Sequence, residues 1–180
     1  MESGTDVNLT DIWGSPDGSI VWACGWRDLP PKTVLLRQSS GSWEVVYEDE
    51  QHLFTPRQDS LSGTLHSVWT DAPHRLYVLT RHNLYLCPPE TRGEGIAQWE
   101  GENWASRWIR GTAANNLFVV GFQGRIWHFN GQSWYLYPQL INVRDDLFGI
   151  AVREDHVVAV GWRVYNGIEI FGIIYHGRKL

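Results

Sequence analysis

Four short strings of aromatic or cationic residues could bind a ligand, because each follows directly on an apolar run. An aromatic face stacks on a sugar ring or anchors a protein partner, and an arginine holds a carboxylate or stacks on a ring. The recurrence of these residue types predicts a single ligand-binding rim. Its expected members are Trp26, Arg27, Arg81, His82, Phe122, Trp162 and Arg163. The alternative is that these aromatic residues only pack between neighbouring structural elements.

The patterns that would support catalysis are weak. The seven histidines, at positions 52, 66, 74, 82, 128, 156 and 176, make no H-x-H or H-E-x-x-H pattern, and the two cysteines make no C-x-x-C pair. We therefore expect no metal site and no cofactor. Acids such as Asp145-Asp146 and Glu154-Asp155 could include a glycosidase pair, but adjacent acids in loops are usually solvated surface.

Composition and charge limit the classes of function. The chain has 180 residues, a formal net charge of -5, 11 Trp and 18 Gly. Nucleic-acid binding needs a clustered basic surface, so no nucleic-acid partner is expected. No apolar run reaches the roughly 18 residues of a membrane span. The opening residues MESGTDVN lack the apolar core of a secretory signal, which leaves the compartment open.

Cys24 and Cys87 both lie in apolar strand contexts, WACGW and LYLCP. Two buried thiols are the expected arrangement. A disulfide between them is the alternative, although two cysteines do not make a disulfide framework.

The rim residues must be held by equivalent turns, and the sequence supplies a repeating unit for this purpose. Four apolar strands, expected at 20–25, 76–80, 117–121 and 157–161, can be aligned on one another. Their equivalent residues Trp22, Tyr77, Phe118 and Val158 are 55, 41 and 40 residues apart. A period near 40 with several strands in each unit is typical of propeller blades.

Each of these second strands has neighbours that complete an antiparallel meander. First strands are expected at 9–13, 65–69, 105–109 and 147–151, with connecting segments rich in Gly, Pro, Asp and Asn. Third strands are expected at 32–37, 83–87, 124–129 and 170–176, and fourth strands begin at Trp43, Ile96 and Trp134. The polar, proline-containing stretches 50–63 and 88–95 are expected to be surface loops.

The fourth unit stops where its last strand should start. The chain opens with S-G-T before its first strand, and the same S-G-T precedes the first strand of the second unit. The N-terminal segment is therefore expected to complete the last blade, or a second copy of the chain completes a larger ring as a homodimer. Either arrangement would remove an exposed strand edge.

The repeated pattern resembles bacterial Trp-rich β-propeller repeats, with unit three, GTAANNLFVVGFQGRIWHFNGQSW, matching nearly throughout. The resemblance implies an all-β propeller with four four-stranded antiparallel blades in one domain, residues 1–180. The blades are expected at roughly 9–50, 65–100, 104–138, and 147–180 with 1–7. The resemblance also implies an extracytoplasmic or cell-surface location, and it implies little about function because propellers host many activities.

In a propeller the rim residues would lie on one face, and the first strands would line a central channel. Asp11, His66 and Arg107 are the expected channel-lining residues, facing water or a small polar ligand. If the ring closes, Trp26 and Trp162 become neighbours. The favoured function is a non-enzymatic binding or scaffold module for a protein or a glycan. The alternative is a glycan-cleaving or lyase-type enzyme with a site at the channel mouth.

Overall fold

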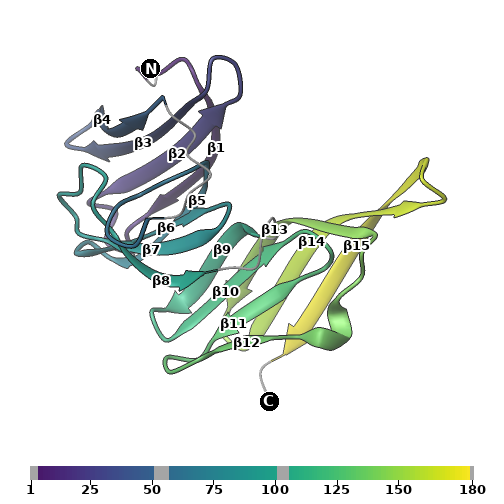
Figure 1. The fold of residues 1–180 in the computed structure, drawn as a ribbon. Coiled ribbons are helices and arrows are strands. Elements are labelled where there is room, and N and C mark those ends of the chain that lie inside the picture. Colours follow the sequence, from purple (N-terminus) through teal and green to yellow (C-terminus); the bar gives the residue numbers. More distant parts are fainter. Residues whose placement is uncertain (1–3, 51–56, 101–105, 179–180) are drawn as a thin grey trace. The chain divides into compact units, whose positions relative to one another are not determined.

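A computed structural model describes residues 4–50, 57–100 and 106–178. The chain separates into two compact units, unit 1 (Met1–Asn103) and unit 2 (Trp104–Leu180). Each unit holds two antiparallel sheets in which consecutive strands are hydrogen-bonded neighbours, as the ribbon shows (Figure 1). Each sheet is one meander and has the form of a propeller blade.

Unit 1 contains blades 1 and 2. Blade 1 is built from β1 (Asn8–Gly14), β2 (Val21–Arg27), β3 (Lys32–Ser39) and β4 (Ser42–Asp49). Blade 2 is built from β5 (Leu65–Ala72), β6 (Arg75–Thr80), β7 (Asn83–Cys87) and β8 (Ile96–Glu100).

Unit 2 contains blades 3 and 4. Blade 3 is built from β9 (Ser106–Ala113), β10 (Asn116–Gly121), β11 (Ile126–Phe129) and β12 (Trp134–Leu136), followed by a short 3-10 helix, η1 (Pro138–Leu140). Blade 4 has three strands, β13 (Asp145–Arg153), β14 (His156–Tyr165) and β15 (Glu169–Arg178).

The core of unit 1 lies between its two blades. One face of β2, with Trp22 and Cys24, packs against Val78 and Cys87 of blade 2. Strand residues alternate between the two faces of a sheet, so Ala23 lies on the other face of blade 1. There it packs with Val34, Leu36 and Val7.

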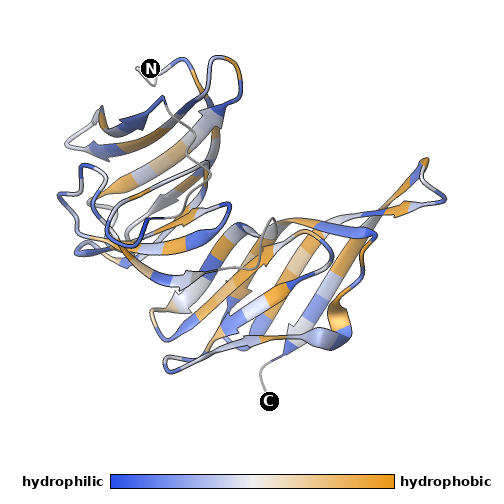
Figure 2. Ribbon diagram, in the orientation of Figure 1, coloured by the Kyte–Doolittle hydropathy of each residue, from blue (hydrophilic) through white to orange (hydrophobic). Residues whose placement is uncertain are grey.

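The core of unit 2 is built in the same way. Phe118, Val120 and Ile126 of blade 3 pack against Leu147 and Ala159 of blade 4. Apolar residues run along inner strands such as β2 and β14 (Figure 2), as expected for strands in stacked blades. Burial of these faces is the main favourable contribution to folding.

The predicted all-β architecture of four blades, and the order of strands within each blade, are confirmed. Cys24 and Cys87 are both buried thiols, as expected. The two predicted surface loops are not entirely at the surface. In 88–95, Thr91, Gly93 and Gly95 are buried; in 50–63, residues 61–63 are buried, and residues 51–56 lie outside the described residues.

Completion of blade 4 stays a prediction. Its sheet ends at β15, and no other strand of the described residues pairs with β15 on its outer edge. Val7 of the N-terminal segment packs on blade 1, while residues 1–3 lie outside the described residues, as do 104 and 105 of the predicted third blade. One domain over residues 1–180, a closed ring and a homodimer also stay predictions. Among the described residues, no helix is long and apolar enough to cross a membrane.

Candidate functional site

A β-bulge recurs in the first strand of every blade and sets which side chains leave the sheet. Near the start of the first strand, the register of the first two strands shifts in every blade, at Thr10, His66, Arg107 and Phe148; blades 2 and 3 have a second shift at the other end of that strand. A bulge bends its strand and re-aims one side chain, and bulges are frequent beside functional sites. Of the predicted channel residues, His66 and Arg107 stand at this position and Asp11 follows it.

In unit 2 the bulge residues and the rim residues form one row, which we call the aromatic–arginine row. The guanidinium carbon of Arg107 lies 4.4 Å from the ring centre of Phe122 and 5.6 Å from that of Phe148. The ring of Phe148 lies in turn 3.9 Å from the ring of Trp162. Arg107 therefore makes cation–π contacts on both sides, which fixes a flat cation within a set of aromatic rings.

Sequence reasoning named Phe122, Arg107 and Trp162 but missed Phe148, the residue that joins them. Phe148 lies in the first strand expected at 147–151, and nothing in its apolar character distinguishes it from its neighbours. The available signal was its alignment with His66, since both follow a leucine that opens a first strand. That alignment would have placed an aromatic side chain at the bulge of blade 4.

The row ends at a hairpin arm formed by the ends of β14 and β15. The two strands stay paired from Trp162–Gly172 to Tyr165–Glu169, and the arm extends beyond the rest of the blade 4 sheet (Figure 1). Asn166, Gly167 and Ile168 join the two strands, with positive φ at Asn166 and Gly167 and a hydrogen bond from Ile168 N to the carbonyl of Tyr165 at 3.2 Å. The large exposed apolar residues of this region are Trp162, Tyr165, Ile168, Ile170 and Phe171.

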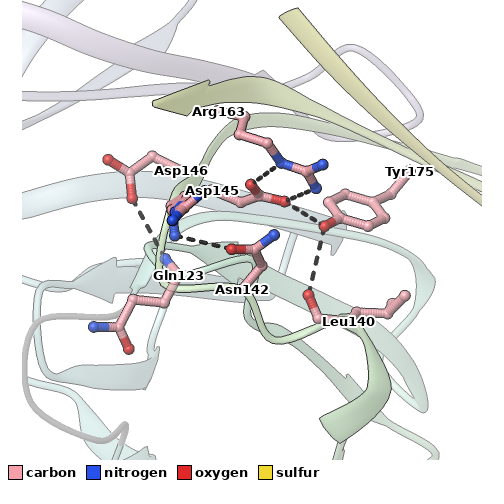
Figure 3. Close-up of polar contacts among 8 residues, drawn as sticks. Gln123, Leu140, Asn142, Asp145, Asp146, Arg163 and Tyr175 are labelled. Atoms are coloured by element: carbon pink, nitrogen blue, oxygen red, sulfur yellow. Dashed lines mark hydrogen bonds and ion pairs between the residues drawn. The ribbon is translucent and has the colours of Figure 1, made fainter. Parts of the chain in front are cut away.

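A polar network holds the base of the arm (Figure 3). The carboxylate of Asp145 is fully buried and accepts two hydrogen bonds from Arg163, Nε to Oδ1 at 2.6 Å and Nη2 to Oδ2 at 2.8 Å. The hydroxyl of Tyr175 also donates to Oδ2. The hydrogen bonds from Arg163 hold the pKa of Asp145 below its usual range, and burial raises the pKa of Tyr175.

The same network ties blade 4 to the turn that carries Phe122. Gly124 N donates to the carbonyl of Asp145 at 2.7 Å, and Asn142 N donates to the carbonyl of Gln123 at 2.8 Å. Asp146 accepts a further hydrogen bond from Gln123 N at 3.4 Å (Figure 3). Arg163, predicted to be a ligand contact, is therefore paired with Asp145 and supports the row from within blade 4.

In unit 1, Trp26 and the bulge residue His66 lie together. Their rings meet edge to face with centroids 6.0 Å apart. Asp11 is buried beside them, where its carboxylate accepts hydrogen bonds from the hydroxyl of Ser67 and from Val68 N. These donors come from blade 2, so Asp11 links the two first strands of unit 1.

The remaining rim residues of unit 1 are Arg27, Arg81 and His82, and the contacts described for them lie within unit 1. Arg27 pairs with Asp6 at 2.5 Å and donates from Nε to the carbonyl of Pro30 at 3.0 Å. Arg81 and His82 form the turn between β6 and β7, where Arg81 N donates to the carbonyl of Thr64. Burial lowers the pKa of His82. The predicted set therefore divides between the units, and Trp26 and Trp162 belong to different units.

No metal centre is formed by the parts of the chain that the structure describes, since no three His, Cys, Asp or Glu side chains gather there. The two buried carboxylates near the rim, Asp11 and Asp145, are both engaged by hydrogen-bond donors. The arrangement is suited to stacking and apolar contact at the row and at the arm.

The fold defines this protein as a β-propeller-type chain, and the aromatic–arginine row combines residues of the first and second strands with Phe122 of a turn. The rim was expected in turns, but Trp26 and Arg27 lie at the end of β2, and Trp162 and Arg163 lie within β14. No protein-family model matches the sequence, and no curated protein matches it. These two comparisons therefore assign the chain to no family.

Solved structures match over most of the chain. A computationally designed protein, Ika4, aligns with a TM-score of 0.60 and 8% identity over 96% of this chain and 93% of its own. YCF48 bound to D1 peptide aligns with a TM-score of 0.65 and 15% identity, covering 98% of this chain and 52% of that chain. YCF48 from Cyanidioschyzon merolae aligns with a TM-score of 0.61 and 12% identity, covering 86% and 48%. The chain thus spans about half the length of the YCF48 chains.

Proposed function

We propose that this protein is a non-enzymatic binding module that docks on a partner protein through the arm and the aromatic–arginine row of unit 2. The observation that carries the proposal is the exposed apolar surface of the arm. Ile168 is 87% exposed, Ile170 65% and Trp162 41%. Apolar residues gathered in this way on one projecting element are typical of protein interaction sites.

The row gives the arm a rigid base. Aromatic and arginine side chains contribute most of the binding energy in protein interfaces, because they bury a large area with few rotatable bonds. Phe148 and Arg107 hold the ring of Trp162 and that of Phe122 in place before any partner arrives. Such preorganisation lowers the entropy cost of association.

Two further observations favour a protein partner over the alternatives. One of the propeller-type structures that this chain resembles, YCF48, is bound to D1 peptide. The buried carboxylates that a glycan-cleaving or lyase site would need are instead held by structural donors, Asp11 by blade 2 and Asp145 by Arg163. A glycan ligand stacked on Trp162 is the second candidate, because that ring is exposed.

Site-specific photo-crosslinking tests the proposal. A benzophenone amino acid at Ile168 is compared with the same residue at Leu29, which is 88% exposed and lies in unit 1. In cells of the native host we expect one protein adduct from position 168 that is absent from position 29. Trp162→Ala should reduce its yield by about tenfold, whereas Tyr135→Ala, at another exposed aromatic residue, should not.

A different set of results would identify a glycan, the second candidate ligand. If position 168 gives no protein adduct, and the protein binds a glycan array in a way that Trp162→Ala abolishes, the ligand is a glycan and the protein-docking proposal is wrong.

A further inference from the structure

A pocket of about 160 Å³ opens between blades 3 and 4 at the end of the sheets opposite the arm. Its lining includes the exposed residues Glu154 and Asp155, in the turn between β13 and β14, and Gly177 and Arg178 at the end of β15. The arm lies at the turn between β14 and β15, so this pocket is separate from the proposed docking surface.

The interior of the pocket is mainly apolar. Its walls are the side chains of Phe118, Ile126, Leu140, Val152 and Val157. An apolar pocket of this size favours an apolar ligand. The favourable free energy of binding comes from removing the apolar surfaces of both pocket and ligand from water.

Among the polar residues that line the pocket, His128 and Tyr137 are held in place by their neighbours. The imidazole of His128 lies flat on Phe118, with ring centres 4.1 Å apart, and its Nε2 is 2.9 Å from the amide oxygen of Asn116. That oxygen only accepts, so Nε2 carries the proton and Nδ1 accepts from the hydroxyl of Tyr137 at 3.3 Å. The hydroxyl oxygen of Tyr137 then keeps the capacity to accept a hydrogen bond.

The pocket exists because a glycine stands where the equivalent blade carries a side chain. Gly177 pairs with Val157, as Cys87 of blade 2 pairs with Leu76 at the equivalent position. A Cβ placed on Gly177 would meet no atom within 4 Å. The thiol of Cys87, by contrast, lies within the core of unit 1.

We infer that this pocket is a binding site for a small planar aromatic molecule that carries one hydrogen-bond donor, of the size of phenol or indole. An apolar protein cavity of about 150 Å³ holds benzene, so one ring fits the volume. The ring would stack within the walls of Phe118 and Val157, and its O–H or N–H would donate to the hydroxyl oxygen of Tyr137.

Isothermal titration calorimetry of the full chain with phenol and with indole tests this site. We expect saturable binding to one site with a dissociation constant of about 0.1–1 mM, in the range that ligands of this size reach. Gly177→Leu should fill the pocket and weaken binding by at least about tenfold. Gly172→Leu is the matched control, because Gly172 is on the opposite face of the same strand and its Cβ also meets no atom within 4 Å; its affinity should equal that of the natural sequence.

A second variant separates the hydrogen bond from the volume. Tyr137→Phe should weaken the binding of phenol and leave the binding of toluene unchanged, since toluene has no donor. The inference is overturned if neither phenol nor indole gives saturable binding up to about 10 mM, well above the expected dissociation constant. It is equally overturned if folded Gly177→Leu binds both rings as tightly as the natural sequence does.

Discussion

The junction between blades 1 and 2 is filled by the chain itself, whereas the equivalent junction between blades 3 and 4 holds a pocket. In unit 1 the loop 88–95 returns from β7 and packs on blade 1. Gly93 lies so close to Tyr47 that an added Cβ would come within 2.5 Å of the ring. Leu61 N donates to the carbonyl of Gly93 at 2.7 Å, which fixes the loop from its other side.

Residues at equivalent positions serve different purposes in the two junctions. Arg37 pairs with Trp22 across β2 and β3, as His128 pairs with Phe118 across β10 and β11. Arg37 donates to the carbonyl of Pro89 at 3.1 Å and pairs with Glu44 at 3.0 Å, so it fastens the loop. His128 contacts Asn116 and Tyr137 within its own blade instead.

The loop 88–95, with buried Thr91 and Gly93, makes the junction between blades 1 and 2 part of the core. Between blades 3 and 4, the described residues leave a pocket whose lining includes Gly177 and Arg178. The repeat therefore sets the blades, while the residues at each junction decide whether a pocket is present there. Unit 2 then relies on the Asp145 network for rigidity at its other end.

Arg163→Ala should have the largest effect on stability. It leaves the buried carboxylate of Asp145 without its cationic partner and with only the hydroxyl of Tyr175 as a side-chain donor, although solvent screens part of the lost attraction because the Arg163 side chain is 40% exposed. Hydrogen exchange followed by mass spectrometry should show faster exchange in peptides of unit 2 and unchanged exchange in unit 1. Equal acceleration in both units would contradict the view that the network serves unit 2.

Gly93→Val should destabilise unit 1 by about 2–3 kcal/mol, because the new side chain overlaps Tyr47 and must adopt a φ of +119°. Hydrogen exchange of unit 1 peptides, followed by mass spectrometry at increasing urea concentration, measures this loss of unfolding free energy. An unchanged unit 1 would show that the loop does not close the junction.

The destabilisation caused by Arg163→Ala should depend on pH. In the natural sequence the pKa of Asp145 is lowered by folding, so its stabilisation is complete above the ordinary aspartate pKa and is lost as pH falls through the lowered value. In the Arg163→Ala variant, protonation of the buried Asp145 carboxylate, which has lost its cation, stabilises the folded state. The difference in unfolding free energy between the two proteins should therefore shrink below about pH 4. If the difference in unfolding free energy stayed constant from pH 7 to pH 3, the charge of the Asp145 carboxylate would not be the cause of the destabilisation.

Gly177→Leu should have the smallest effect on stability, within about 1 kcal/mol of the natural sequence, since it adds apolar volume to open space without a positive φ. Thermal denaturation checks this expectation. A loss as large as that of Gly93→Val would mean that the two junctions do not differ in the proposed way.

The sequence predicted the blades because their strands carry strong local signals. Apolar runs, Asn-Gly and Gly-containing turns and the 40-residue period locate nearly every strand. The alignment of the four second strands also gave the positions predicted for the rim. What the sequence did not reveal was the partner of each polar side chain: Asp145 with Arg163, Asp11 with Ser67, and Phe148 between Arg107 and Trp162.

Those contacts depend on tertiary features that have no local signature. A β-bulge decides whether Phe148 points along the row, and residues in contact there are far apart in sequence. The pocket is harder still to predict, because it depends on the open space beside Gly177 rather than on any motif.

The measurement that tests the contrast between the junctions most directly is a heteronuclear NMR titration of the full chain with indole. We expect progressive chemical-shift changes at Tyr137, Tyr175 and Gly177, and none at Tyr47 or Gly93. Changes of equal size at both junctions, or changes at Tyr47 and Gly93 alone, would contradict an open junction in unit 2 and a closed one in unit 1.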